Sequence, residues 1–498
     1  MITLGFPSSV QHILERIVTA LPLGTPAYLV GGAVRDLLCS RPTHDLDFTL
    51  PGNAILTARQ LASALNTAFY PLDYERDTGR LILNDEILGR LAIDFTAFRG
   101  ADLEGDLRDR DFTINAIAID LRQPTKLIDP LGGVRDLQSR VLRPCSPAAL
   151  ENDPIRILRA VRLSIELSIR ILPETTNLIR KALPGLARIS SERLRDEIFR
   201  ILDCPAPASA IRILDILGVI PYVFPELPAL KGVAQSPPHT LDAWDHTLTT
   251  VQEIGNLLNV LKCEFDPETA ASWALALVSL RLGRFRQQLH DHLEFQLNPE
   301  RSIPSLICLA ALYHDISKPQ TSQTDKHGQI HFYGHDQMGE EISRKRGQVF
   351  RLSNLEIARM ASIVRFHMRP ILLGRSSEPP SRRAIYRFFR DAGAAGVDAC
   401  LLALADTLAT YGPGLPRAKW IHMVDVIRIL LEAWWEQPDE IISPPILLNG
   451  NDLMLNFNID PGPQVGELLE LIREAQAAGE LHDRAQALAF AHDKLNQG

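Results

Sequence analysis

The chain has 498 residues, which at roughly 100–200 residues per domain predicts three or four domains. Hydrophobic residues make up 46% of it and charged residues 22%, an ordinary mixture that excludes global disorder, a collagen-like repeat and a coiled-coil rod. The net charge of −8 argues against a surface coated with positive charge for indiscriminate nucleic-acid binding. A local basic groove is still compatible with this charge.

Six cysteines lie far apart and form no C-x-x-C pair, so we expect free thiols in a reducing compartment rather than disulfides or a zinc site. The first 17 residues turn into an amphipathic helical pattern before any cleavable apolar core, so we expect no signal peptide. No apolar run approaches the roughly 18–20 residues that cross a bilayer. The sequence therefore predicts a cytoplasmic protein without a membrane partner, and it leaves the oligomeric state open.

Strand-like runs alternate with helical segments up to about residue 150, and helical periodicity dominates after Pro154. The expected strands are 28–32, 45–50, 80–85, 90–98 and 115–121. Stretches rich in proline and polar residues interrupt the helical part at 221–240 and 436–452. The sequence thus predicts an α+β multidomain protein with a head at 1–150, a helical neck at 151–220, a helical body at 221–435 and a C-terminal segment at 436–498.

Two adjacent glycines, Gly31 and Gly32, follow the first expected strand. Glycine lets a backbone approach a phosphate closely, and a helix that starts there offers free N–H donors, so this turn favours a phosphate site. Arg35 adds a guanidinium group that can bind phosphate oxygens. An ordinary strand-to-helix turn has the same pattern, so the glycines alone do not decide.

Two carboxylates, Asp45 and Asp47, alternate along the next expected strand. Side chains two residues apart on a strand share one face, so both can hold a hard cation such as Mg²⁺. Asp94, on another expected strand, is a candidate third carboxylate. Paired carboxylates are what a two-metal phosphoryl-transfer site requires, so we predict that these three are catalytic.

Two charged motifs follow the carboxylates. The run RDFTINA brings together a cation, a carboxylate and an amide at Arg110, Asp111 and Asn115. The run DPIRILRAVR repeats charged residues every three positions, which predicts one charged stripe along a helix, at Asp153, Arg156, Arg159 and Arg162. The residues between them are apolar, so we expect this stripe to face a polar cleft rather than bulk water.

The motifs GGAVRD, DLDFT, RDFTINA, DPIRILRAVR and ISSERLRDE together resemble the class II tRNA nucleotidyltransferase (CCA-adding enzyme) and bacterial poly(A) polymerase family, over about the first 215 residues. The resemblance implies a polymerase-β-like nucleotidyltransferase head with a mixed sheet, an all-helical neck, tRNA as partner, and CTP and ATP as substrates. It implies that Asp45 and Asp47 bind Mg²⁺. Nucleotide contacts are implied for the triphosphate at Gly32 and Arg35, for the ribose or phosphates at Arg110, and for the nucleotide more generally at Gly31, Asp111 and Asn115.

The same family uses protein side chains as a template, and Asp153 and Arg156 match those positions. A carboxylate accepts a hydrogen bond from the exocyclic amine of cytosine or adenine while the guanidinium donates to the neighbouring ring acceptor. Guanine and uracil present the reverse pattern, so they would be rejected. Arg159 and Arg162 would then contact the base edge, ribose or phosphates.

The chain departs from the family pattern at two residues, Asn152 in place of the usual Glu and Asp109 in place of a frequent Arg. In addition, only residues 95–109 separate Asp94 from Arg110. Family members that add the whole CCA end usually have a longer flexible segment there, which helps the site to switch from C to A. The sequence therefore leaves open whether the chain adds CC, A or the full CCA.

A second candidate site starts at His314 and Asp315, which follow a strongly apolar helix, where an unpaired carboxylate is costly unless a cation binds it. The order of histidines and aspartates resembles the HD superfamily of metal-dependent phosphohydrolases, in its HDxxKP form. The resemblance implies an HD domain within 221–435, with one divalent ion of unknown identity at His246, His314, Asp315 and Asp406, and a second at His335 and His367. A metal-activated water would attack a phosphate ester. The alternative is a relic HD fold that serves only to bind tRNA.

Basic clusters at 151–200, 281–286, 344–346 and 382–390 are candidates for contacts with tRNA phosphates, and each is also compatible with an ordinary solvated face. The stretch 448–466 looks like the tail of HD-containing family members, and we interpret the C-terminal segment as a tRNA-contacting cap. Three rivals to tRNA nucleotide addition remain: a poly(A) polymerase, an HD phosphohydrolase acting on RNA ends, and a non-catalytic RNA-binding protein.

Overall fold

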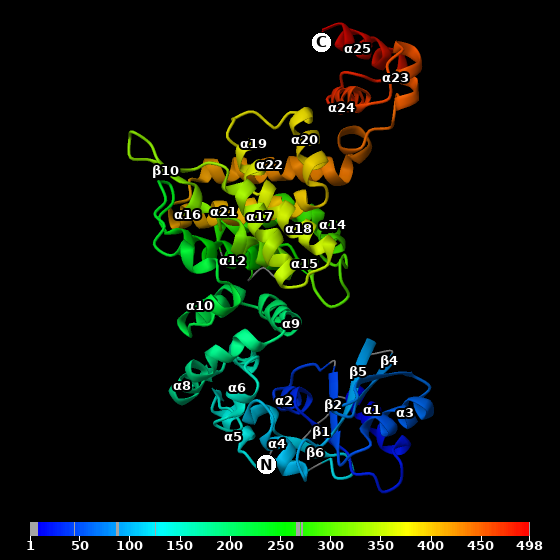
Figure 1. The fold of residues 1–498 in the computed structure, drawn as a ribbon, viewed down its shortest axis with the longest axis vertical. Helices are drawn as coiled ribbons and strands as arrows, with labels where there is room; N and C mark the ends of the chain where they lie inside the picture. Colours follow the sequence, from blue (N-terminus) through cyan, green and yellow to red (C-terminus); the bar gives the residue numbers. More distant parts are fainter. Residues whose placement is uncertain are drawn as a thin grey trace. The chain divides into compact units, whose positions relative to one another are not determined.

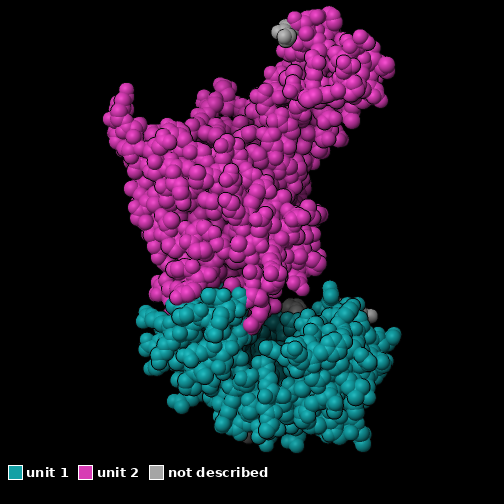
Figure 2. All heavy atoms as spheres, viewed as in Figure 1, with its two compact units in different colours: residues 1–189 teal, residues 190–498 magenta. Residues whose placement is uncertain are grey.

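The computed structural model describes residues 8–43, 45–85, 89–124, 126–264, 269 and 272–497. The chain divides into two compact units, Met1–Ile189 and Ser190–Gly498 (Figure 2). The four-part division expected from the sequence is finer than these two units and stays a prediction.

A seven-stranded mixed sheet forms the centre of the first unit (Figure 1). Its strands are β1 (Tyr28–Val30), β2 (Asp45–Leu50), β3 (Ala68–Asp73), β4 (Thr78–Asp85), β5 (Gly89–Ala97), β6 (Ala118–Asp120) and β7 (Leu127–Ile128). They lie in the order β3-β4-β5-β2-β1-β6-β7. Strands β2 and β5 pair in parallel and the other neighbours pair antiparallel. The expected α+β class with a mixed sheet in the head is confirmed.

The first unit also contains helices, some of which pack on this sheet and some of which lie beyond it. They are α1 (Ser8–Ala20), α2 (Gly32–Leu38), α3 (Ala54–Leu65), α4 (Leu103–Arg108), η1 (Thr113–Asn115), α5 (Gly133–Gln138), α6 (Ala149–Asn152), α7 (Arg156–Glu166), α8 (Pro173–Ala182) and η2 (Leu183–Arg188). Two short strands, β8 (Val141–Leu142) and β9 (Arg170–Ile171), pair in parallel between these helices.

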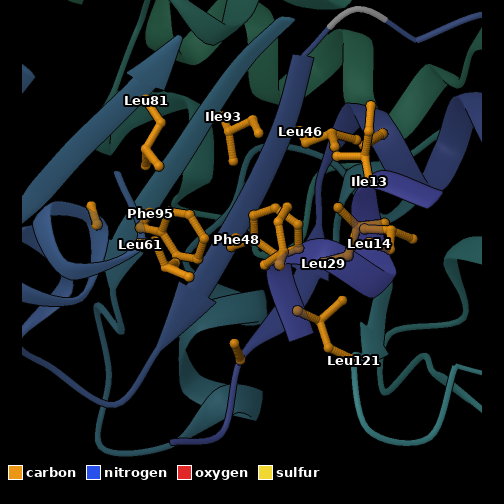
Figure 3. Packing of buried hydrophobic residues seen from close by; sticks show 14 of the residues in the cluster. Ile13, Leu14, Leu29, Leu46, Phe48, Leu61, Leu81, Ile93, Phe95 and Leu121 are labelled. Atoms are coloured by element: carbon orange, nitrogen blue, oxygen red, sulfur yellow. The ribbon is translucent and has the colours of Figure 1, made fainter. Parts of the chain in front are cut away.

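The hydrophobic core of the first unit lies on one face of the sheet, where α1 and α3 pack (Figure 3). Leu46 and Phe48 of β2 belong to it, and the Phe48 ring stacks on Phe95 of β5 with centroids 4.9 Å apart. Because side chains alternate across a strand, Asp45 and Asp47 point to the opposite face. The hydrophobic pattern of β2 therefore decides which face carries the carboxylates.

Strand β3 was not among the expected strands, whereas the five expected ones are confirmed to within a few residues at each end. Its sequence AFYPLD contains Pro71, which removes a backbone donor and weakens a strand signal. Pro71 is tolerated because β3 is an edge strand, and the pairing with β4 is irregular between Pro71 and Asp73.

The charged stripe expected from Asp153 to Arg162 is only partly helical. Helix α6 ends before Asp153, whose backbone is extended (φ −143°, ψ 90°), and α7 begins at Arg156. The reason is Pro154, since a residue that precedes proline is disfavoured in the helical region. The helical part of the stripe therefore starts at Arg156.

The second unit consists mainly of helices. They are α9 (Ser191–Leu202), α10 (Pro207–Ile216), α11 (Ile220–Val223), η3 (Leu227–Leu230), α12 (Ala243–Val260), α13 (Trp273–Leu282), η5 (Gly283–Phe285), α14 (Arg286–Leu293), α15 (Ile303–Tyr313), α16 (Lys318–Thr321), α17 (His335–Val349), α18 (Asn354–Phe366), α19 (Met368–Leu373), α20 (Arg382–Ala392), α21 (Ala395–Tyr411), η6 (Gly412–Gly414), α22 (Arg417–Glu436), the π-helix η7 (Pro438–Ile442), α23 (Gly450–Phe457), α24 (Pro463–Ala477) and α25 (Arg484–Gln497). A hairpin of β10 (Ser322–Thr324) and β11 (Ile330–Phe332), absent from the expected strands, interrupts them.

Helix α21 is the central helix of this body, being buried along most of its length and in contact with α12, α18, α19 and α22. Among the described residues no single helix is both long and apolar enough to cross a membrane; one pair, 382–392 with 395–414, meets that test only jointly and is bent by 108°. All six cysteines are free thiols, as expected.

The C-terminal helices α23–α25 have a small hydrophobic core of their own, around Leu453, Leu468 and Ile472. Helix α20 faces them with its arginines: Arg387 Nε donates to Glu474 at 2.8 Å, and Arg390 Nη1 donates to Glu470 at 2.8 Å. These arginines belong to the cluster that we considered for tRNA phosphates. In the structure, carboxylates of the same chain engage them.

Candidate catalytic and metal sites

The three predicted catalytic carboxylates lie together on the open face of the sheet. Asp47 of β2 is the register neighbour of Asp94 of β5, and Asp45 lies two residues before Asp47 on the same face. The Asp45 side chain is exposed, whereas Asp47 and Asp94 are half-buried. The two strands thus deliver carboxylates to one place, with one of them open to solvent.

Arg80 of β4 holds the third carboxylate in place. Its Nε and Nη2 each donate to one oxygen of Asp94 at 2.7 Å, a bidentate pair, and this bond raises the pKa of Arg80. Arg80 starts one of the expected strands, and no sequence motif around it signals this role. Only the register of β4 against β5, which pairs Arg80 with Asp94, reveals the contact.

Burial raises the pKa of Asp47 to about 6, with Arg110 opposing this shift and the carboxylates of Asp94 and Asp45 adding to it. Gly31 lies against the same atoms. A Cβ on Gly31 would come within 3.2 Å of Asp47 Oδ2 and 3.3 Å of Arg110 Nη1, and its φ of +74° is one that favours glycine. The first glycine of the GG turn is therefore required where the turn meets the carboxylates.

A hydrogen-bonded chain connects the GG turn with the RDFTINA motif and α7. Arg35 Nη1 donates to Asn115 Oδ1 at 2.8 Å, and Arg35 also forms two bonds with Asp36. Asn115 Nδ2 donates to Asp111 at 3.0 Å, and Asp111 accepts a further bond from Arg159 at 3.0 Å. Burial would raise the pKa of Asp111, but Arg159 and Asn115 hold it below its usual value. The structure therefore brings four of the predicted nucleotide residues into one network.

The two residues that resemble the family's template differ in their surroundings. Arg156 is buried, and its guanidinium donates to the carbonyl oxygens of Asp109 at 2.7 Å, Arg110 at 3.1 Å and Ala149 at 3.2 Å. Its Nε lies 4.0 Å from a carboxylate oxygen of Asp153, which is partly exposed. Arg156 thus anchors the residues that lead into the RDFTINA motif. Arg162, two turns further along α7, pairs with Glu166 at 3.0 Å.

Asp106, which the sequence analysis did not single out, organises the short segment between Asp94 and Arg110. It is buried, accepts a bond from the backbone N–H of Arg99 at 3.1 Å and pairs with Arg110 Nη2 at 3.1 Å. Asp102 caps the start of α4 by accepting from the N–H of Gly105 at 2.8 Å. The segment therefore contains a short helix, α4, whose start is capped and whose residues bond to the rest of the segment.

The predicted HD ligands converge in the second unit. His246 Nε2 lies 3.0 Å from Asp406 Oδ1 and 3.6 Å from Asp315 Oδ2. His314 Nε2 is 3.0 Å from Asp315 Oδ2. On the other side of Asp315, His335 Nε2 lies 3.6 Å from Oδ1 and 3.4 Å from His367 Nε2. All six predicted residues thus meet around the Asp315 carboxylate.

Backbone carbonyls orient three of these histidines. The Nδ1 atoms of His314, His335 and His367 each lie 2.7 Å from the carbonyl oxygen three residues earlier. His314 and His367 directly follow α15 and α18, where the last carbonyls of a helix have no partner within it. An Nδ1–H bonded to a carbonyl leaves Nε2 as the ligand atom, and Nε2 is the atom that faces the centre in each case.

This donor set fits a divalent cation. The Nε2 atoms of His246 and His314 and Oδ2 of Asp315 are buried and lie within 4.8 Å of one another, which makes them a compact set of potential metal ligands. Burial lowers the pKa of His367 to about 3, so the ring is neutral, as a metal ligand must be. Burial would raise the pKa of Asp315, but His314 and Lys318 hold it well below its usual value.

Two further residues lie at this site, and neither was among the expected ligands. His239 offers a ligand atom within 4.8 Å of those of His246 and Asp406. Lys318 Nζ lies 2.6 Å from Asp315 Oδ2 and donates to Gln235. The HDxxKP spacing signals Lys318, whereas His239 stands in a loop with no motif around it. A cavity of about 560 Å³ opens beside the cluster, and its lining includes the cations of Lys318, Arg375 and Lys419.

Three family models match the chain. The Poly A polymerase head domain matches residues 27–143, the probable RNA and SrmB-binding site of polymerase A matches residues 169–230, and the HD domain matches residues 279–411. The head-domain match covers the carboxylate face of the first unit, and the HD match covers most of the histidine cluster of the second. Fold and sites together define a nucleotidyltransferase fused to an HD domain.

Similar proteins narrow this class. The A-adding tRNA nucleotidyltransferase of Deinococcus radiodurans is 33% identical, over 94% of this chain and 95% of its own length. The CC-adding tRNA nucleotidyltransferase of Thermus thermophilus is 32% identical, over 94% of both chains. The solved structure of a CCA-adding enzyme with CTP has the same fold, with a TM-score of 0.60 and 21% identity over 98% of this chain and 96% of that one. The chain therefore belongs to the tRNA nucleotidyltransferase family.

Proposed function

We propose that this protein adds nucleotides to the 3′ end of tRNA without a nucleic-acid template. The observation that carries the proposal is the group of Asp45, Asp47 and Asp94 beside the GG turn, in a chain of this family. The 3′-hydroxyl oxygen of the tRNA attacks the α-phosphorus of CTP or ATP, the bond to pyrophosphate breaks, and the hydroxyl proton is released. The chain contributes by positioning the reactants and by stabilising charge.

Asp45 and Asp47 are the residues that would hold Mg²⁺. They fit because they are carboxylates, which Mg²⁺ prefers, and because Asp47 is kept half-buried next to two other acidic groups, so that a cation relieves their repulsion. Mg²⁺ supplies charge stabilisation at the phosphates when it is bound. In this proposal the triphosphate and ribose of the nucleotide are bound by Gly31, Gly32, Arg35 and Arg110. Asp111 and Asn115 keep the side chains of this region in position through their hydrogen bonds.

The base is read, in this proposal, by Asp153 and Arg156, with Arg159 and Arg162 beside them. Asp153 is partly exposed and so remains accessible to an exocyclic amine. The carbonyl bonds of Arg156 support its position, and reading a base requires it to exchange one of them for a ring acceptor. We place the reaction in the cytoplasm, which the six free thiols support.

We further propose that the chain is a specialist that adds the two cytidines. The segment between Asp94 and Arg110 is short, and Asp102 and Asp106 tie its helix α4 down, which opposes the rearrangement needed to switch from C to A. The relatives named CC-adding and A-adding match over nearly the whole chain, whereas proteins named multifunctional CCA protein match over 42% of it.

The test uses three tRNA transcripts, which end before the first C, after the second C, and after the A. Purified protein with Mg²⁺ receives CTP and ATP separately and together, and products are resolved at single-nucleotide length. Addition that stops after two cytidines supports the specialist. A complete CCA end, or A added only to the CC-ended transcript, contradicts it, and long A tracts favour a poly(A) polymerase. If active, metal-loaded protein extends no transcript, nucleotide addition itself is refuted.

A second activity, hydrolysis of phosphate esters at the HD site, is favoured by the buried histidine and aspartate ligand atoms that face one centre and by the adjacent cavity, whose lining includes three cationic side chains. There the ester is cleaved by water, releasing phosphate. The test measures phosphate released from an RNA that carries a 3′-terminal phosphate, with Mn²⁺, Co²⁺ or Ni²⁺, in the wild type and in Asp315→Asn. No release with any metal would support the tRNA-binding alternative.

A further inference from the structure

Half of the carboxylate face of the sheet has no assigned role. The residues that we assign to the nucleotide lie on the side of β1 and β6, at Gly31, Arg110 and Asn115, while the carboxylates stand in the middle on β2 and β5. Strands β4 and β3 form the other side. In phosphoryl transfer the attacking and leaving oxygens are roughly in line. A triphosphate on the β1 side therefore requires the attacking hydroxyl to arrive from the side of β4 and β3.

A row of register neighbours leads from the carboxylates to this side. Asp47 is paired with Asp94, Asp94 with Arg80, and Arg80 with Tyr70 of the edge strand β3. All four belong to the same face, because the residues next to them in sequence pack in the core on the other face, namely Phe48, Phe95, Leu81 and Phe69. The row is continuous across four strands.

The outer members of the row are accessible to a substrate. Tyr70 is 53% exposed, and the Arg80 side chain is 38% exposed. Arg80 uses Nε and Nη2 for Asp94, and its Nη1 takes no part in those two bonds. An exposed aromatic ring on a sheet, with an arginine beside it, is the arrangement on which proteins stack the bases of single-stranded RNA. Bound RNA would also meet positive charge at Arg80, next to the carboxylates.

We propose that Tyr70 and Arg80 form the seat of the acceptor end of the tRNA. Tyr70 stacks on the base of the 3′-terminal nucleotide, and Arg80 contacts the phosphate of that nucleotide while it holds Asp94. The terminal 3′-hydroxyl then reaches the carboxylates from the side opposite to the triphosphate. This inference rests on the proposed nucleotide addition, because it assigns the acceptor half of the same site.

The first experiment is steady-state kinetics of full-length protein with CTP and a transcript that ends before the first C. In Tyr70→Ala the KM for tRNA should rise roughly 5- to 100-fold, the range that corresponds to loss of one base stack, while the KM for CTP stays unchanged. Tyr70→Phe should keep the wild-type KM, because the ring remains. Tyr74→Ala is the matched control, since it removes an exposed tyrosine from the turn of the same hairpin.

A second readout does not depend on turnover. A transcript with 2-aminopurine as its 3′-terminal base should lose fluorescence on binding to the wild type and to Tyr70→Phe, and should lose much less on binding to Tyr70→Ala. Arg80→Gln removes the positive charge that contacts the phosphate in this proposal, as well as the bidentate bond to Asp94. Its KM for tRNA should rise in addition to any fall in kcat.

The outcomes are distinct. If folded Tyr70→Ala has the wild-type KM for tRNA and the wild-type quenching, the acceptor seat is refuted, while nucleotide addition by the wild type stands. If Arg80→Gln lowers kcat alone, the phosphate contact is refuted and Arg80 only positions Asp94. If the wild type extends no transcript, the proposed function fails instead. Thermal melting of every variant shows whether a loss reflects unfolding.

Discussion

The carboxylate face of the first unit and the histidine cluster of the second both bring side chains of the cation-ligand type together, yet they are opposite in construction. Asp45 is exposed on an open sheet, whereas His314 and Asp315 are almost fully buried among helices. The carboxylates of the first site are balanced by nearby arginines, Arg80 at Asp94 and Arg110 at Asp47. The second site keeps its histidine and aspartate ligand atoms buried and close to one another. An open site suits cations that come and go with a nucleotide, and a closed site suits one that stays.

The largest expected effect comes from removing a carboxylate of the open site. Asp45→Asn or Asp47→Asn should lower the rate of nucleotide addition at least about a thousandfold, because several kcal/mol of charge stabilisation are lost. The metal content of the HD site, measured by mass spectrometry, should not change. Asp73→Asn, which alters an acidic residue at the sheet edge, is the control. If these variants also lost the metal of the HD site, the two sites would not be independent of each other.

The second-largest effect is expected at the ion pair of Arg301 and Glu356, which supports a helix of the closed site. Glu356 is buried, forms a bidentate pair with Arg301 at 2.6 and 2.9 Å, and belongs to the capping box of α18, the helix that leads to His367. Glu356→Gln should lower the free energy of unfolding by about 3 kcal/mol, since it leaves a buried guanidinium with only the more distant carboxylate of Asp196, at 3.9 Å. Urea unfolding of the variant and of Glu294→Gln, which alters an exposed glutamate, tests this expectation.

The same pair predicts a pH dependence. Burial would raise the pKa of Glu356, but the bonds from Arg301 and Ser353 lower it. A carboxyl whose pKa is lower in the folded state contributes stability above its unfolded pKa of about 4.3, and this contribution disappears as pH falls through the folded-state pKa. The stability difference between wild type and Glu356→Gln should therefore be full at pH 7 and shrink below about pH 4. A difference that grows on acidification would contradict the pairing.

A smaller effect is expected when the cation of the closed site is removed. Dialysis against a chelator should lower the Tm of the second unit by several degrees, and adding the metal back should restore it. The reason is that a ligand at about 100 times its Kd adds roughly 2.7 kcal/mol to the free energy of unfolding. His246→Ala should behave like the chelated protein, and His290→Ala, an exposed histidine, like the wild type. Unchanged melting, with the metal shown to be gone, would mean that the site holds no structural cation.

The smallest effect concerns α20. Arg387→Ala should cost less than about 1 kcal/mol of stability, because the Arg387 side chain is half-exposed and its pair with Glu474 is screened by water. The KM for tRNA should stay unchanged, because Glu474 already engages this guanidinium. A clear rise in that KM would instead show that the cluster 382–390 contacts tRNA.

Local motifs made much of the molecule predictable. Residues two apart on a strand share a face, so Asp45 and Asp47 could be placed together from the sequence. The adjacent His314 and Asp315 could be recognised as a candidate site because they follow a strongly apolar helix. Strand β3 was not predicted, because Pro71 interrupts its pattern. Asp153 was wrongly placed within a helix, because the effect of Pro154 on the residue before it outweighs the three-residue period.

What the sequence by itself determined is therefore local: the mixed head, the helical body, and the types of residue that chemistry needs. Only the tertiary structure decided which of them meet. The contact of Arg80 with Asp94 depends on strand register, and the approach of His239 to His246 and Asp406 depends on how helices far apart in the chain pack. Register and packing are set by the summed burial of many distant side chains, and no short motif encodes that sum.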